Sequence, residues 1–337
     1  MIWLTWRQHR KQLLYTLIAL AAAAAVIVPT GLSMHHAFVN SGLAACIAKA
    51  GNAQLVGGNV GDCGELARQF QQSYNGLTFL GILMVIFPVF VGIFFGAPLV
   101  AQEIERGTHR FVWTQGVSRL RWALAKFGLI GLVALVIGAI YAYGVDWWTQ
   151  PLMAQGQGRI NYLSFDIQGV APVAYTLFAV ALGVFLGVFM RKVLPAMGVT
   201  VAAFIAVRGV IEYVARKHYL GPASLKLPIS TTTLQYNQYA GDWIYSNSVV
   251  SAQGKTLLPS AQLQCQGSNV TSMSSTGGPI QANANPCADA AYNGAYNLQV
   301  YQPGTRFWEF QWIESGIFVA LAALLIWFAL VRLRRIS

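Results

Sequence analysis

Six long apolar runs constrain the fold of this 337-residue chain more than any other feature. Each run holds roughly the 17–25 residues that cross a hydrocarbon core of about 30 Å as an α-helix. Strands of a membrane barrel are excluded, because they alternate over about ten residues, whereas these runs are apolar on every face. The sequence therefore predicts an all-α polytopic membrane protein. The runs are Leu13–Met34, Leu77–Ala101, Phe127–Val145, Val173–Met190, Val193–Tyr213 and Ile313–Val331.

The first apolar run has a second interpretation as a cleaved signal peptide. Arg7, Arg10 and Lys11 precede it, and Ala21–Ala25 is a small-residue stretch of the kind found near cleavage sites. The run is longer than a usual signal core, which favours a membrane span. Cleavage would leave the orientation of the later spans unchanged.

The segment before the first run has the pattern of an interfacial helix. Within Ile2–Gln12, the side chains of Ile2, Trp3 and Trp6 share one helical face, and the basic residues follow them. Tryptophan rings anchor such helices in the headgroup layer of the membrane. The simpler alternative is a basic flank of the first span. Both interpretations place the segment in the cytoplasm.

Basic residues are distributed unequally between the two sides of the membrane. With the N-terminus inside, four cytoplasmic segments of about 45 residues hold 13 of the 22 Lys and Arg residues, whereas about 168 outside residues hold eight. The positive-inside rule therefore predicts a multi-pass protein of the bacterial cell membrane with both termini in the cytoplasm. The net charge of +11 reflects this topology. Charges spread beside lipid over four segments argue against nucleic-acid binding.

All four cysteines fall on the predicted outside, which is the oxidising side of the membrane. Cys46 and Cys63 lie in the first outside loop, and Cys265 and Cys287 lie in the last one. The pairs Cys46–Cys63 and Cys265–Cys287 are the simplest of the three connectivities. A zinc site is the alternative, but no C-x-x-C or histidine spacing accompanies these residues.

The polar segment between the fifth and sixth runs predicts an extracellular domain. It spans 214–312, is rich in Ser, Asn, Gln, Tyr and Gly, and is expected to fold around its disulfide. The preceding unit, 1–213, then holds the interfacial helix and spans one to five. The last unit, 313–337, holds the sixth span and a basic cytoplasmic tail.

The cytoplasmic loop between the second and third runs, 102–126, is too long for a simple turn. Glu103 and Glu105 come early and Arg119 comes late, which is the charge order that complements a helix macrodipole. An apolar stretch in the loop predicts contact with a protein partner, because membrane proteins rarely expose such a stretch to water. An ordinary basic loop is the alternative. The stretch is Phe111–Trp113, and it follows a break at Gly107-Thr108 that offers a helix N-cap.

The fourth and fifth runs are predicted to form a tight antiparallel hairpin, because little more than Arg191-Lys192 separates them. Gly183 and Gly187 stand four residues apart, the spacing that lets two membrane helices approach closely, and Gly198 follows in the next run. The spacing suits packing within the chain and a dimer face equally well.

The fifth run carries two charged residues, Arg208 and Glu212, spaced four apart. Ionisable residues inside a membrane helix indicate a functional site by default, so both are candidates for the translocation path. The alternative is an ion pair near the outer end of the helix that only fixes the orientation of the helix.

No catalytic, cofactor or metal motif is recognisable in the sequence. Gly254-Lys255-Thr256 resembles the end of a phosphate-binding loop, but Val249 stands where the earlier glycine is required. We therefore expect a chain that is not an enzyme and holds no cofactor or metal of its own.

The order of the elements and two short motifs resemble the permease subunits of type-two ABC exporters. The opening MIWLTWRQHRKQ, residues 1–12, and the stretch YQPGTRFWEFQW, residues 301–312, are similar to actinobacterial permeases of this class. Glu103 followed by Gly107-Thr108 is similar to the family's Glu-x-x-x-Gly-Thr signature after the second span. Val117-Ser118-Arg119, with Lys126 further on, is similar to the family's Pro-Val-Ser-Arg stretch that leads into the third span, although Gly116 stands where the family often has proline. The last outside segment is also much longer than in many members of the family.

The resemblance implies a coupling helix within residues 103–121, seated in a cleft of a separate ABC ATPase subunit that binds ATP and Mg. Two permease chains, expected as a homodimer, would pair with two ATPase chains. Together they would form the path for a drug-like, lipidic or peptide substrate. The residues that the resemblance assigns to ATPase coupling are Glu103, Glu105, Gly107, Thr108, Phe111, Trp113 and Arg119.

Two other functions compete with export. In one, the chain is a membrane-anchored sensor or assembly subunit whose extracellular domain binds a ligand and which transports nothing. In the other, it is an ion-coupled transporter that works alone and uses Arg208 and Glu212 as coupling residues. The absence of inverted-repeat signals argues against this last function.

Overall fold

Six helical segments in the computed structural model are long and apolar enough to cross a membrane. Each contains most of one predicted run, so the prediction of a mainly helical, six-span membrane protein is confirmed. The six spans are Ala21–Asn40, Phe79–Glu105, Leu120–Met153, Ala171–Met190, Val193–His218 and Gly304–Arg334. The structure describes residues 2–50, 61–107, 118–154, 159–160, 162–229, 242–266, 269–274 and 293–335.

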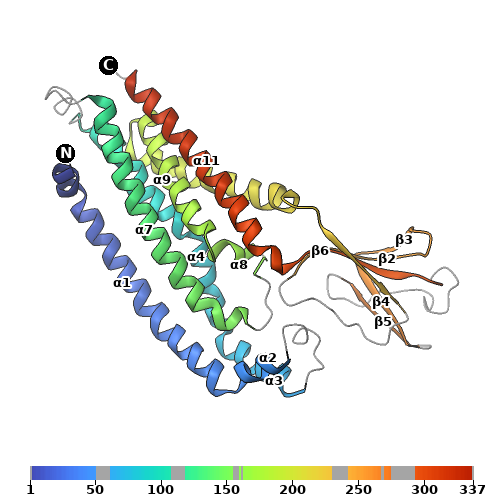
Figure 1. Ribbon diagram of the computed structural model, residues 1–337. Coiled ribbons are helices and arrows are strands. Elements are labelled where there is room, and N and C mark those ends of the chain that lie inside the picture. The colour runs from blue at the N-terminus through green and yellow to red at the C-terminus, as the bar shows by residue number, and fades with distance from the viewer. Residues whose placement is uncertain are drawn as a thin grey trace.

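The long helices lie side by side in one bundle (Figure 1). Two of the membrane spans contain a π-helical turn. The second span is continuous through α4, η2 and α5, and the fifth is continuous through α10, η3 and η4. The helical elements are α1 (Ile2–Asn40), α2 (Leu43–Ala50), α3 (Gly61–Tyr74), η1 (Asn75–Leu77), α4 (Thr78–Val91), η2 (Gly92–Gly96), α5 (Ala97–Glu105), α7 (Arg119–Met153), α8 (Tyr162–Ile167), α9 (Ala171–Met190), α10 (Val193–Val210), η3 (Ile211–Ala215), η4 (Arg216–His218), η6 (Gly304–Arg306) and α11 (Phe307–Arg334).

The predicted interfacial segment, Ile2–Gln12, is not a separate element. α1 is helical without interruption from Ile2 to Asn40, because no glycine or proline stands between the amphipathic stretch and the apolar run that follows it. The first helix is therefore longer than the hydrocarbon core requires, and its N-terminal turns extend beyond the span that begins at Ala21.

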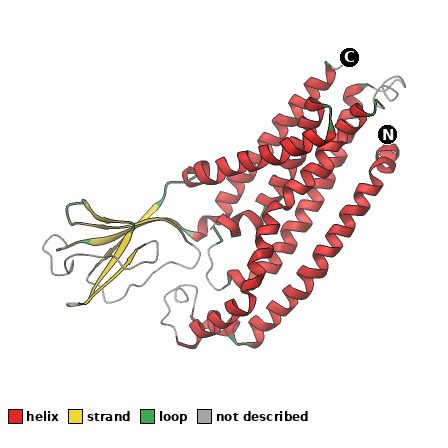
Figure 2. Cartoon of the chain, turned by 180° about the vertical axis from the view of Figure 1, so that it is seen from behind, coloured by secondary structure: helices red, strands yellow, loops and turns green. Residues whose placement is uncertain are grey.

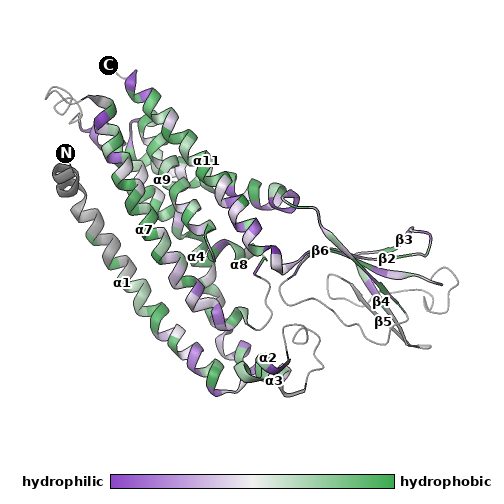
Figure 3. Cartoon of the chain, in the orientation of Figure 1, coloured by the Kyte–Doolittle hydropathy of each residue, from purple (hydrophilic) through white to green (hydrophobic). Residues whose placement is uncertain are grey.

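The two ends of the bundle differ in what they carry. Both chain termini, the end of α5 and the start of α7 lie at one end, which we call the termini end (Figure 1). α2, α3 and the strands lie toward the other, which we call the sheet end (Figures 1 and 2). Apolar residues line the helices between these ends, and hydrophilic residues gather near the ends (Figure 3). This distribution matches a bundle that crosses a hydrocarbon layer.

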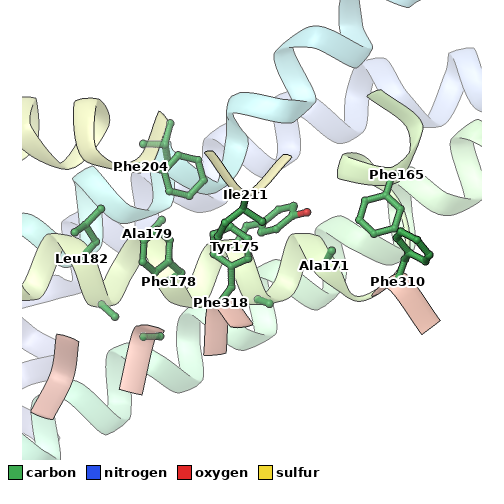
Figure 4. Packing of buried hydrophobic residues seen from close by; sticks show 14 of the residues in the cluster. Phe165, Ala171, Tyr175, Phe178, Ala179, Leu182, Phe204, Ile211, Phe310 and Phe318 are labelled. Carbon is green, nitrogen blue, oxygen red and sulfur yellow. The ribbon is translucent and has the colours of Figure 1, made fainter. Parts of the chain in front are cut away.

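α9 is the central helix of the bundle. In the most apolar stretch of α9, 67% of the residues are buried inside the protein, compared with 11% in the corresponding stretch of α1. α9 packs against α4, α7, α10 and α11, and its aromatic side chains build the main core with those of the neighbouring helices. In Figure 4, Tyr175 lies between Phe178 and Phe204 on one side and Phe165 and Phe310 on the other.

Glycines let α9 approach the second span closely. A Cβ atom built on Gly183 would lie 2.6 Å from the carbonyl oxygen of Gly92, and one on Gly187 would lie 2.6 Å from that of Ala97. No side chain fits into these contacts. The Gly183 and Gly187 pair therefore serves packing within the chain. The pair packs against the second span. A Cβ atom built on Gly198 would meet nothing within 4 Å, so Gly198 takes no part in this contact.

The segment between the fifth and sixth spans contains two small antiparallel sheets, which together we call the sheet domain. Four strands pair in the order β1-β6-β2-β3, and β4 pairs with β5. The side-chain amide of Asn297 joins the two sheets, since it accepts from Leu263 N and donates to Leu263 O. The strands are β1 (Ala223–Pro228), β2 (Trp243–Val250), β3 (Thr256–Pro259), β4 (Ala261–Gln266), β5 (Asn269–Ser274) and β6 (Tyr296–Gln302).

The sheet domain is shorter than the predicted segment, 214–312. The fifth span remains helical to His218, and α11 begins at Phe307. The predicted segment starts too early because Arg216 is charged and looks like a loop residue, although its partner Glu314 lies inside the sixth run. In the structure both side chains are fully buried against each other.

One predicted disulfide is confirmed. Cys46 in α2 is bonded to Cys63 in α3, with their Cα atoms 5.8 Å apart, and the bond joins these two helices at the sheet end. The second predicted pair stays a prediction, because Cys287 and the side chain of Cys265 lie outside the described residues.

Candidate functional site

Four charged side chains from four different elements meet inside the bundle near the sheet end, and we call them the ion network. Arg208 of α10 lies 2.8 Å from Asp166 of α8. Arg216 of η4 contacts Asp166 at 2.5 Å and Glu314 of α11 at 2.7 Å. Each of the four side chains is 7% exposed or less. The network therefore joins four helical elements through charges that have no access to bulk water.

A π-helical turn brings the two arginines of the network to the same side of the fifth span. In an uninterrupted α-helix, residues eight apart point about 80° away from each other. The π-helical turn at Ile211–Ala215 accommodates one extra residue. Arg208 and Arg216 therefore have the directions of two residues that are seven apart in a regular α-helix, and these differ by only about 20° around the helix axis. The side chains of both residues consequently point at Asp166.

Arg208 also ties the fifth span to the second. Its Nη1 donates to Val85 O at 3.1 Å. Pro88 lies three residues later inside α4 and lacks an N–H group, so the carbonyl of Met84 has no helical donor. The hydroxyl of Tyr141 in α7 donates to that carbonyl at 2.7 Å. The third and the fifth span thus each bond to a backbone carbonyl in the turn before this proline.

Two tyrosines complete the network. Tyr175 donates to Glu314 at 2.6 Å, and its hydroxyl lies 3.3 Å from Asp166. Tyr219, just beyond the fifth span, lies 3.3 Å from Glu314. Burial and the Glu314 carboxylate raise the pKa of Tyr219, which keeps its hydroxyl a donor. Arg208 lies over the ring of Tyr175, at 4.4 Å from the ring centroid. Hydrogen bonds and ring contacts of this kind are what makes buried charges tolerable.

The predicted pair of Arg208 and Glu212 is not what the structure forms. Among the described residues, the ion pair of Arg208 is with Asp166, and Glu212 is half-buried within the π-helical turn. The four-residue spacing assumes a regular α-helix, and the helix ceases to be regular at Ile211. The burial of Arg208 agrees with its selection as a candidate, and the functional role of both residues stays a prediction.

Sequence reasoning missed three members of the network. Glu314 is an acidic residue inside the sixth apolar run, and the rule that selected Arg208 also applies to Glu314. Asp166 and Arg216 carry no such signal, because they stand outside the predicted runs. α8, which carries Asp166, folds back into the bundle, and its residues Ser164–Ile167 are buried.

A second set of contacts holds the base of the loop between α5 and α7, and we call it the loop brace. The carboxylate of Glu103 forms a buried ion pair with Lys126 of α7. Glu105 accepts a hydrogen bond from Val193 N, the first residue of α10, at 3.0 Å. The end of the second span is therefore fastened to both the third and the fifth. α9 and α10 meet in a tight turn at Arg191-Lys192, as predicted.

The remaining predicted coupling residues lie around the brace. Gly107 has a φ of 72°, a left-handed conformation that ends the helix without strain. Ser118 caps α7 by accepting from Arg121 N. Arg119 begins α7, and its side chain lies outside the described residues. Thr108, Phe111 and Trp113 also lie outside them, so their roles stay predictions.

The fold and the two charged sites define a multi-pass helical membrane protein with buried ion pairs at both ends of its bundle. Residues 17–216 match a family described as "ABC-2 membrane transporter related". Because the match covers more than half of the chain, the protein belongs to this family, which confirms the resemblance found in the sequence. Searches of curated proteins and of solved structures gave no match.

The family match ends at Arg216, so it includes three members of the ion network and all of the loop brace. The sheet domain and α11, with Glu314, lie beyond it. In the part of the chain that the structure describes, no three His, Cys, Asp or Glu side chains are grouped to hold a metal ion.

Proposed function

We propose that the protein is the membrane-spanning permease subunit of an ATP-driven exporter. A separate ABC ATPase binds ATP and Mg and contacts the loop between α5 and α7. Two permease chains, as a homodimer, form a path for a drug-like, lipidic or peptide substrate. Membership of the family supports the permease class, since permeases of this family are generally non-catalytic subunits that pair with an ATPase.

The loop brace is the observation that carries the proposal. A motor that pushes on a cytoplasmic loop moves the membrane spans only if the base of the loop is fixed to them. The Glu103–Lys126 ion pair and the Glu105–Val193 hydrogen bond provide that attachment on two different helices. Buried charge pairs resist separation, because either partner left alone in a low dielectric is strongly disfavoured. Force on the loop therefore reaches α7 and α10 together.

α10 links the loop brace to the ion network. Val193 and Arg208 are fifteen residues apart in one helix, a rise of about 22 Å. A shift of α10 at the termini end consequently pulls on the contact between Arg208 and Asp166 near the sheet end. In this mechanism the ion network switches between two arrangements. In one, its ion pairs are closed as in the structure, and in the other, the contact between Arg208 and Asp166 opens during substrate release.

The charge distribution supports the orientation that the proposal needs. The basic pair Arg191-Lys192 and the basic residues at the end of α11 lie at the same end as the loop brace. The positive-inside rule makes that end cytoplasmic, where an ATPase operates on the loop. The disulfide Cys46–Cys63 lies toward the opposite end, which then faces the oxidising side.

Co-purification with an ATPase tests the proposal. We expect the chain to co-purify with a Walker-type ATPase encoded by a neighbouring reading frame, and to stimulate ATP hydrolysis by that subunit. Deletion of Phe111–Trp113 is expected to abolish the stimulation while the permease still folds. Unchanged stimulation after the deletion would reject the assignment of this loop as the coupling segment.

The sheet domain favours the second candidate, a sensor or assembly subunit. It lies outside the family match, and hydrogen bonds hold the two segments that connect it to the bundle against each other: Gln302 donates to Leu220 O and Arg306 to Gly221 O, both at 2.7 Å. If stimulated hydrolysis occurs without movement of any substrate across reconstituted vesicles, this function replaces export.

A further inference from the structure

An apolar groove of about 400 Å³ lies between α1, α4 and α7. α4 and α7 contribute Leu83, Phe87, Ile140 and Gly144, among others, and α1 contributes Ala23, Ala24, Val26, Ile27 and Val28. α1 packs mainly on α7, and most of its side chains in the groove region are exposed. The groove is therefore a space within the membrane-spanning part of the protein that the chain itself does not fill.

Hydrocarbon suits this groove better than water does. Its lining is almost entirely apolar, and the hydroxyl of Tyr141 is already engaged by the Met84 carbonyl. Water would find no hydrogen-bond partners there, and an empty space of this size forfeits the dispersion contacts of its lining. Gly144 opens the floor of the groove, since a Cβ atom there would meet nothing within 4 Å.

A polar pocket of about 440 Å³ adjoins the groove toward the sheet end. Trp147 lines both spaces. Its ring stacks on His35 of α1 with centroids 5.0 Å apart, and its carbonyl oxygen lies 3.0 Å from His35 Nε2. The indole is thus held in place as the boundary between an apolar compartment and a polar one, the position that tryptophan takes at the edge of a membrane.

The polar pocket presents one cation and one anion. The side chains of Arg159 and Asp146 are 40% and 48% exposed and lie 3.1 Å apart. Gln168 accepts from Arg159 Nε, and Thr149 and Gln150 also line the pocket. A guanidinium has five donors, and a phosphate accepts two of them side by side. The carboxylate of Asp146 suits an N–H or O–H donor on the same ligand.

From these two adjoining spaces we infer that the protein binds a phospholipid whose acyl chain lies in the groove and whose head lies in the pocket. The phosphate contacts Arg159, and a donor group of the head, such as an ammonium or a hydroxyl, contacts Asp146. The two volumes lie in the usual range for ligand sites. The inference goes beyond export, because it concerns lipid binding to this chain and holds with or without an ATPase.

Photo-crosslinking of the full chain in lipid nanodiscs tests the acyl-chain site. The probe is phosphatidylethanolamine with a diazirine in the middle of one acyl chain. We expect Gly144→Leu to lower labelling of residues 21–28 and 80–87 by about tenfold, the effect of displacing roughly two methylene groups. Gly131→Leu is the matched control on the same helix, because its Cβ also meets nothing within 4 Å and it does not line the groove.

A second pair of variants approaches the groove from α1 and covers the case in which Gly144→Leu does not fold. Ala24→Phe is expected to lower labelling of residues 80–87, and Ala25→Phe, at an exposed position of α1 that does not line the groove, is expected to leave it unchanged. Equal labelling in all four variants, or no labelling of these segments in the parent chain, would overturn the inference.

The head group is tested with two probes that share the diazirine chain. Phosphatidylethanolamine has N–H donors for Asp146, whereas phosphatidylcholine has none. We expect stronger labelling by the first, a difference lost in Asp146→Asn, and weaker labelling by both in Arg159→Gln. Arg68→Gln, an exposed arginine of α3 outside the pocket, is the control and is expected to change nothing. Identical labelling by both probes in the parent chain would contradict the assignment of the head.

Discussion

The loop brace and the ion network both bury charge, but they differ in how many elements depend on them. The Glu103–Lys126 pair connects two helices that are neighbours in the chain, 23 residues apart. The network connects α8, α10, η4 and α11, and its contact between Arg216 and Glu314 spans 98 residues. In the network, Asp166 contacts two arginines and Arg216 contacts two carboxylates. Both charges of the Glu103–Lys126 pair can be removed together by two substitutions. Two substitutions in the network leave at least one of its other charges without a partner that it has now.

The largest effect is expected for Glu314→Gln. The substitution removes one of two fully buried carboxylates and leaves Arg216 with part of its charge uncompensated, so the free energy of unfolding falls by about 3–5 kcal/mol. Unfolding of the purified protein in detergent measures the loss. Glu309→Gln on the exposed face of the same helix is the control, and we expect a change within about 0.5 kcal/mol. Equal effects for both variants would show that the network does not hold the bundle together.

Lys126→Met is expected to have the next largest effect, about 3 kcal/mol, because Glu103 is left buried without its lysine. The exposed Arg121→Gln, about one turn earlier in α7, is the control.

The double variant Glu103→Gln/Lys126→Met sharpens the comparison between the two sites. Removing both charges of this pair together is expected to restore most of the stability, since neither of the two is left without the other. Glu314→Gln/Arg216→Met is expected to restore much less, because Asp166 keeps its contact with Arg208 but loses Arg216. Similar recovery at both sites would mean that the network behaves as independent pairs.

The sequence predicts the brace and the network to different degrees, for a physical reason. The spans, the loop and the first disulfide follow from hydropathy, charge and cysteine position, which are local in the chain. Arg208 stands out because it lies inside an apolar run. Asp166 and Arg216 become partners only after α8 folds inward and a π-helical turn rotates the fifth span. Neither event leaves a pattern in a single sequence, so long-range pairing at the sheet end was beyond prediction.

Glu105→Ala is expected to have a smaller effect on stability than either buried pair. The carboxylate is exposed and accepts one hydrogen bond from Val193 N, so its loss lowers the free energy of unfolding by about 1 kcal/mol. Stimulated ATP hydrolysis is expected to fall further than stability does, because the contact links the loop to α10. Glu105→Gln keeps an acceptor oxygen and is expected to restore the stimulation. Full stimulation in Glu105→Ala would exclude this contact from the coupling route.

The smallest effect is expected for Glu212→Gln. If the fifth span were a regular α-helix, Glu212 would pair with Arg208, and its neutralisation would cost several kcal/mol in the buried bundle. The π-helical turn directs Arg208 to Asp166 instead, so we expect a change in the free energy of unfolding of about 0.5 kcal/mol or less. Asp166→Asn, measured by the same unfolding experiment, is the matched variant and is expected to be far more destabilising. A large effect of Glu212→Gln together with a small effect of Asp166→Asn would restore the four-residue pair and remove the π-helical turn from the account of the network.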